Sequence, residues 1–176
     1  MFIFVIVIAL CFLVERLVCF LSAENNGKII HRWLTILPLT TYSLIILCAI
    51  IDFIQAKGSL NYFLSILGVF FISTGVILRR KTVGALGNQW SAYIKIFPEQ
   101  KLIKDGPYKI MRHPYLFSVV CELIGFCLLL NSFYSLALVF LIQVPILVLR
   151  GYSEEKILYS LFNKEYAEYR DKASFL

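Results

Sequence analysis

Residues 102–116 read LIKDGPYKIMRHPYL and form the longest polar interval in a very apolar chain. Gly106 and Pro107 predict a tight turn, and Pro114 stands where a helix begins, just before an apolar run. A proline at the first helical position leaves the free backbone N–H groups of the first turn facing outward, where they suit a carboxylate or phosphate. The same residues also fit a simple membrane-surface anchor, so the stretch alone leaves both interpretations open.

The composition around this stretch is that of a membrane protein. The chain has 176 residues, of which 60% are hydrophobic and only 16% charged, and its mean hydropathy is +0.80. The five cysteines lie within apolar runs and lack the spacing of metal ligands, so we expect neither a metal nor a disulfide. The net charge of +6 arises from Lys and Arg that flank apolar segments, which is typical of topology signals and does not favour nucleic acid as a partner.

The apolar runs predict an all-α fold, a polytopic integral membrane bundle of about five transmembrane helices in one membrane domain. The expected spans are residues 2–21, 34–54, 60–78, 114–130 and 133–149. Residues 81–113 are expected to form a folded surface loop whose Trp90 and Tyr93 pack at the headgroup region. Residues 150–172 predict a cytoplasmic amphipathic helix with one apolar stripe.

The distribution of basic residues predicts the orientation in the bilayer. Five spans place the two chain ends on opposite sides. With the N-terminus outside, only Lys57 among the loop lysines and arginines lies outside, as the positive-inside rule requires. We therefore expect a multi-pass protein whose active site is on the cytoplasmic face.

Two sets of charged residues are candidates for chemistry. Arg150 and Glu154 lie four residues apart where the fifth span ends, which places both on one helix face. Such a pair can bind an anionic head through Arg150 and a hydroxyl or ammonium through Glu154, or it can be a helix-end ion pair of little energy. Glu122 lies about two turns into the fourth span, where a carboxylate needs a partner. It is a candidate substrate-binding or pairing residue.

No nucleotide-binding glycine motif is visible, but an ordered set of motifs is. GPYKIMRHPYL at 106–116 is followed after two apolar spans by RGYSEE at 150–155 and FNKEYAEY at 162–169. This combination resembles the isoprenylcysteine carboxyl methyltransferase family, which is related to membrane phospholipid methyltransferases. The resemblance implies an integral membrane enzyme that uses S-adenosylmethionine without a Rossmann domain and methylates a lipophilic substrate.

The resemblance also implies a set of site residues. Arg150, Glu154 and His113 would be catalytic, with Arg150 facing the substrate. The residues around the cofactor would be Gln100, Lys101, Leu102, Ile103, Tyr108, His113, Pro114, Tyr115, Leu116 and Glu154.

The acceptor remains open at this point. A prenylated cysteine carboxylate, as a small lipophilic molecule or a lipidated C-terminal cysteine, is the first choice and needs no general base. A phospholipid amine or an alkylated phenol is the alternative, and a phenol would need His113 or Glu154 as its base. Gln100 replaces a histidine common in the family and Tyr115 lies one position early, which favours a non-catalytic scaffold as a competing hypothesis. A membrane reductase with a nicotinamide cofactor is a third.

Overall fold

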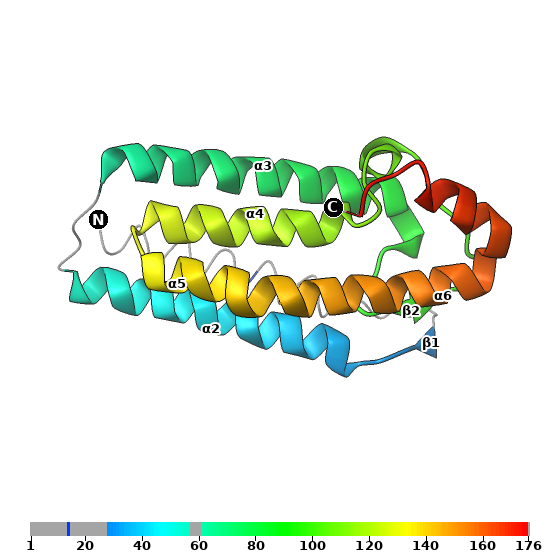
Figure 1. Cartoon of the computed structure of the whole chain (residues 1–176), viewed down its shortest axis with the longest axis horizontal. Coiled ribbons are helices and arrows are strands. Elements are labelled where there is room, and N and C mark those ends of the chain that lie inside the picture. The colour runs from blue at the N-terminus through cyan, green and yellow to red at the C-terminus, as the bar shows by residue number, and fades with distance from the viewer. Residues whose placement is uncertain (1–13, 15–27, 57–60, 176) are drawn as a thin grey trace.

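The computed structural model describes residues 14, 28–56 and 61–175, and most of this part of the chain is helical. Helices α2 (Trp33–Gln55), α3 (Tyr62–Leu86) and α4 (Pro114–Leu129) lie side by side with α5 (Phe133–Leu138) and α6 (Val144–Arg170) (Figure 1). Two-residue strands β1 (Lys28–Ile29) and β2 (Lys95–Ile96) pair antiparallel and tie the link before α2 to the long loop after α3. The predicted all-α class is confirmed.

Three of the described helices are long and apolar enough to cross a membrane: Trp33–Gln55, Tyr62–Gln89 and Phe133–Arg170. The apolar helix α4, with 16 residues, is shorter. The first expected span, residues 2–21, lies outside the described residues except for residue 14, so the count of five remains a prediction. The structure is that of a helical membrane protein.

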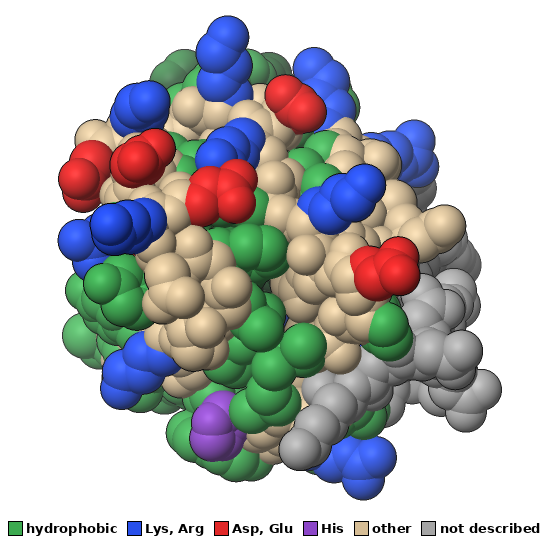
Figure 2. All heavy atoms as spheres, turned by 90° about the vertical axis from the view of Figure 1, so that its right-hand side faces the viewer, with side chains coloured by type: hydrophobic (Ala, Val, Ile, Leu, Met, Phe, Trp, Pro, Cys, Tyr) green, Lys and Arg blue, Asp and Glu red, His purple; other side chains and the backbone are tan. Residues whose placement is uncertain are grey.

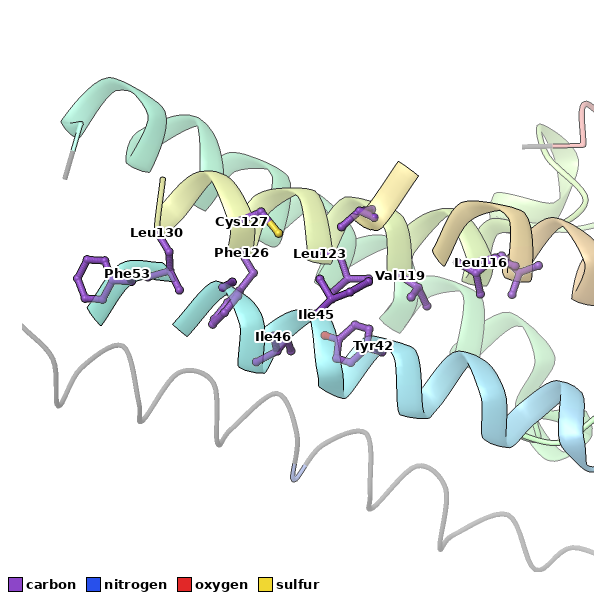
Figure 3. Close-up of a cluster of buried hydrophobic side chains, with 13 residues drawn as sticks. Tyr42, Ile45, Ile46, Phe53, Leu116, Val119, Leu123, Phe126, Cys127 and Leu130 are labelled. Atoms are coloured by element: carbon purple, nitrogen blue, oxygen red, sulfur yellow. The ribbon is translucent and has the colours of Figure 1, made fainter. Parts of the chain in front are cut away.

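The core is formed where one face of α2 packs against α4 (Figure 3). Ile46, Ala49 and Phe53 of α2 are at most 1% exposed, as are Leu123 and Cys127 of α4. Val139, which precedes α6, and Leu147 of α6 complete the cluster. This packing fixes the start of α4 relative to α2 and α6, which is the end of the bundle where the polar loop lies.

Helices α3 and α4 approach closely because glycines face each other. A Cβ on Gly68 would lie 2.6 Å from the carbonyl oxygen of Gly125, and a Cβ on Gly125 would lie 2.6 Å from that of Gly68. The same contact buries Arg79 against Glu122, with 3.0 Å between Nε and Oε1. Helix α3 therefore continues to Leu86, past the basic residues at which the expected third span ended and into the predicted loop 81–113.

The last helix has two irregular points. A π-helical turn, η3 (Val139–Gln143), precedes Pro145, which cannot donate a backbone hydrogen bond. At Asn163, φ is +45° and the helix bends sharply, so that its last part turns back toward the polar loop (Figure 1). The 38 residues from Phe133 to Arg170 make about 57 Å of helix, well beyond the roughly 30 Å of a bilayer core. Part of this helix therefore extends beyond the bilayer core, and its charged residues from Arg150 onward make that end the part expected to do so.

Candidate active site

A cavity of about 160 Å³ with several charged residues in its lining lies at the end of the bundle where the loop after α3, the start of α4 and the outer part of α6 meet. The loop contributes residues around the short helices η1 (Gly87–Gln89) and η2 (Gly106–Lys109). Figure 2 looks onto this end of the molecule, where charged side chains surround a hydrophobic centre. The cavity combines aromatic walls with a few charged groups, as small-molecule sites do.

A network of charged side chains forms one wall of the cavity. His113 is 4% exposed and lies between two carboxylates, with 3.5 Å from Nδ1 to Oε2 of Glu154 and 3.4 Å from Nε2 to Oε1 of Glu155. Arg150 Nε donates to Glu154 Oε1 at 2.9 Å, and Arg112 Nη1 lies 2.7 Å from Glu155 Oε1. The network thus joins residues from the loop with residues of α6.

Local structure explains why these side chains converge. His113 is the N-cap residue of α4 and Pro114 is its first residue, so the chain turns sharply just where the imidazole is held. Arg150 and Glu154 are one turn apart on α6, as their spacing predicts. Arg150 is anchored a second time because its Nη2 donates to the carbonyl of Ala92 at 2.8 Å.

The network sets the protonation states. Burial by itself would raise the pKa of Glu154, but Arg150 and His113 outweigh burial and lower that pKa to about 2. Burial would lower the pKa of His113, but hydrogen bonds to Glu154 and Glu155 outweigh it and raise that pKa above its usual 6.5. The geometry therefore favours an imidazolium between two carboxylates.

Most of the residues predicted to surround a cofactor line this cavity. They are Gln100, Lys101, Leu102, Ile103, Tyr108, His113, Tyr115, Leu116 and Glu154, together with Arg150. Pro114 is buried at the start of α4 and does not line the cavity. Glu122 lies elsewhere, in the α3–α4 contact with Arg79, because the glycine-mediated approach of the two helices buries it there.

Several residues that line the cavity were not predicted from the sequence to be site residues. Tyr166 and Tyr169 line it although they follow the bend at Asn163, and the Tyr169 hydroxyl donates to the carbonyl of Tyr108 at 2.7 Å. Trp90 and Tyr93 line it as well, whereas the sequence suggested headgroup packing. The available signal was that both aromatic residues lie in the segment 81–113, which also holds the Gly106–Pro107 turn and His113.

A second, smaller cavity adjoins the first. It is mainly apolar and is lined by α2, α4 and α6 residues that include Pro38, Leu39, Val119 and Leu147. Tyr115, Leu116 and Arg150 line both cavities, so Arg150 stands where the cavity that holds the charged network meets a cavity whose other lining residues are uncharged.

Fold and site together define a helical membrane protein with a cavity at one end of its bundle that is lined by aromatic and charged side chains. Comparison with known families makes the assignment specific: the model of the isoprenylcysteine carboxyl methyltransferase family matches residues 66–160. The chain belongs to this family, and the resemblance noted from the sequence is confirmed.

Individual relatives are distant. The chain is 32% identical over 82 residues to the uncharacterized protein YpbQ of Bacillus subtilis (strain 168), covering 47% of this chain and 49% of that protein. It is 29% identical over 113 residues to probable protein-S-isoprenylcysteine O-methyltransferases of Oryza sativa subsp. indica and subsp. japonica, covering 63% of this chain and 59% of those proteins. The chain spans about half the length of the curated relatives it matches.

Proposed function

We propose that this chain is a methyltransferase that uses S-adenosylmethionine and acts at the membrane interface on a lipophilic acceptor, with a prenylcysteine carboxylate as the preferred one. Family membership and the names of the rice relatives support the class of reaction. The observation that carries the acceptor chemistry is the position of Arg150, which lines both the cavity that holds the charged network and the adjoining, mainly apolar cavity.

The groups around the first cavity fit the cofactor. Tyr115 and Leu116 lie in the first turn of α4, where backbone N–H groups have no helical acceptor and suit the amino-acid carboxylate of the cofactor. The Glu154 carboxylate is an acceptor for its amino group or ribose hydroxyls. Trp90 and Tyr108, with apolar neighbours of the loop, offer faces for its adenine ring and sulfonium.

When bound, S-adenosylmethionine supplies an electrophilic methyl group on sulfur. The part of this chain is then to align the acceptor and to exclude water. Arg150 is held by Glu154 and by the Ala92 carbonyl, so its guanidinium can fix an acceptor carboxylate without reorganising. The apolar walls of the second cavity suit the lipid part of that acceptor.

The protonation states favour a carboxylate over a phenol. A phenol must lose a proton, and the two candidate bases are His113 and Glu154. The raised pKa of His113 favours its protonated form, which cannot accept a proton, and a carboxylate with a pKa of about 2 is a very weak base. A carboxylate acceptor is already anionic and needs neither residue as a base.

We place the site on the cytoplasmic face and the N-terminus outside. Basic residues gather at the site end of the bundle, in residues 79–113 and in the sequence after residue 150, and the positive-inside rule puts that end in the cytoplasm. A Lys172→Cys variant in intact cells tests this orientation, because Lys172 is exposed. We expect a membrane-impermeant thiol reagent added outside the cells not to label the new cysteine. Labelling by that reagent would refute the proposed orientation.

The first experiment is calorimetric titration of detergent-solubilised protein with S-adenosylmethionine. We expect micromolar-range binding by the wild type and weaker binding by Glu154→Gln and His113→Gln. Glu165→Gln is the matched control, because Glu165 lies on the same helix but pairs with Lys104 at the surface. No binding by folded wild-type protein refutes the proposal and favours a non-catalytic membrane scaffold. If a nicotinamide nucleotide binds instead, the alternative of a membrane reductase is favoured.

The second experiment compares methyl transfer to an N-acetylated farnesylcysteine, to a phospholipid amine and to an alkylated phenol. We expect transfer to the farnesylcysteine and its loss in Arg150→Gln, which keeps a polar side chain but lacks the positive charge. Transfer only to the amine or phenol refutes the carboxylate as acceptor while leaving the methyltransferase class in place.

A further inference from the structure

The segment after the last helix, residues 171–175, lies along the chain that leads into α4 (Figure 1). Ser174 N–H donates to the carbonyl of Ile110 at 3.0 Å, and Arg112 N–H donates to the carbonyl of Ser174 at 2.8 Å. His113 N–H donates to the carbonyl of Phe175 at 3.3 Å. A short parallel bridge between Met111 and Ser174 completes the pairing. The segment thus satisfies backbone groups directly beside the N-cap of α4.

The ring of Phe175 contacts the charged network itself. Its centroid lies 4.8 Å from that of the His113 imidazole and 5.1 Å from that of the Tyr152 ring. The Arg112 guanidinium carbon lies 5.5 Å from the same centroid, within cation–π range. Phe175 does not line the first cavity. It therefore contacts His113 and Arg112 without being able to touch a ligand in that cavity.

Helix α6 leaves room for this ring by having a glycine at position 151. A Cβ on Gly151 would lie 2.8 Å from Cζ of Phe175, closer than real Cβ atoms come to a neighbour, and 3.3 Å from Cδ1 of Leu116. Gly151 follows Arg150 in the sequence, so the residue that admits Phe175 adjoins the residue that faces both cavities. The glycine and the ring form one tight contact behind the site.

We propose that Phe175 is a positioning residue, which holds His113 between Glu154 and Glu155 and so completes the wall of the cofactor cavity. Backbone pairing fixes the position of residue 113, and the ring limits the orientation of its imidazole. Without the ring, the imidazole and the Arg112 guanidinium gain freedom, and Glu154 loses a fixed partner. The proposal deepens the proposed function and rests on it only for the ligand, because the positioning of His113 is a property of the chain alone.

The test combines Phe175→Ala, Phe175→Tyr and Gly151→Ala with Lys172→Ala as the matched control, since Lys172 is exposed on the same segment. We expect Phe175→Ala to weaken S-adenosylmethionine binding and to lower kcat by about tenfold to a hundredfold, because misplacement of about 1 Å has effects of this size. The KM for the acceptor, whose cavity Phe175 does not adjoin, should stay within about twofold. Phe175→Tyr, which keeps the aromatic ring, should retain most of the wild-type binding and kcat.

Gly151→Ala gives an independent and sharper readout. The added methyl clashes with the ring of Phe175, so Gly151→Ala should resemble Phe175→Ala when made alone. Made in the Phe175→Ala background it should have little further effect, because the clashing ring is gone. Strictly additive losses in the double variant would overturn the proposal. If Phe175→Ala does not fold, Phe175→Leu and Gly151→Ala carry the same comparison.

A measurement without ligand separates this proposal from the proposed function. The chain contains two histidines, so a His31→Asn background leaves His113 as the one imidazole signal in a side-chain NMR spectrum. His31 is exposed with φ +52°, a conformation that asparagine tolerates. We expect Phe175→Ala and Gly151→Ala to shift and broaden the His113 signals and Lys172→Ala to leave them unchanged. Unchanged signals in Phe175→Ala refute the positioning role whether or not the wild type binds S-adenosylmethionine.

Discussion

Replacing Glu154 by glutamine should lower the stability of the protein substantially. The neighbours of Glu154 lower its pKa from the usual 4.5 to about 2, which corresponds to about 3 kcal/mol in favour of the ionised form at pH 6. The side chain is only 26% exposed, so solvent screens this interaction weakly. Loss of the full amount would lower Tm by roughly 6–12 °C in a chain of this size. Relaxation of Arg150 toward solvent makes this an upper bound.

The assay is thermal unfolding at pH 6 in one detergent, read by the fluorescence of the two tryptophans and by circular dichroism. Glu165→Gln is the control, because the Lys104–Glu165 pair is as short at 2.8 Å but has side chains 42% and 56% exposed. We expect a change in Tm of less than about 2 °C there, since exposed ion pairs contribute little. If Glu154→Gln changed Tm no more than Glu165→Gln, the reasoning that assigns its low pKa to a strong buried network would be refuted.

Three further predictions concern the bundle and its pH response. Gly125→Ala should lower the free energy of unfolding by about 2 kcal/mol or more, because its methyl meets the backbone of α3 at 2.6 Å. Gly84→Ala, whose methyl would meet nothing within 4 Å, should be neutral or stabilising. Chemical unfolding of both variants tests the close helix contact. Arg79→Met removes the guanidinium beside buried Glu122 and should lower the free energy of unfolding by about 3–5 kcal/mol. Adding Glu122→Leu to Arg79→Met should restore much of that loss, because the unpaired carboxylate is then also gone. The raised pKa of His113 means that its contribution to stability is complete below pH 6.5 and is lost as the pH rises through its folded pKa. The Tm should therefore fall as the pH becomes alkaline. His113→Gln should remove the part of that fall that comes from His113.

The sequence predicted the parts of the site that depend on local rules. The Gly106–Pro107 turn, the proline that begins α4 and the four-residue spacing of Arg150 and Glu154 each follow from short-range geometry, and each is present. Apolar periodicity likewise located α2, α4 and the last helix within a few residues. The motif order then pointed to the family that the comparison confirms.

The remaining features depend on contacts between distant segments. Nothing local showed that α3 would continue through Arg79, because its burial requires Glu122 on another helix. The backbone at Asn163 has a positive φ that asparagine tolerates but does not require. That bend directs Tyr166 and Tyr169 to the cavity, so a pattern of apolar residues on a straight helix could not place them.

The net charge of the site affects which methyl acceptors can bind and how readily the methylated product is released. The network holds three basic side chains, Arg112, His113 and Arg150, against the two carboxylates Glu154 and Glu155. With the imidazole protonated, the network has one positive charge in excess, which an anionic acceptor beside Arg150 neutralises and an ammonium group would increase. In the proposed reaction a carboxylate becomes a neutral methyl ester, so the product loses its attraction to Arg150 and keeps its affinity for the membrane. A methyl ester should therefore bind much more weakly than the free acid, and equal inhibition by the two would refute a role for Arg150 in binding the acceptor charge.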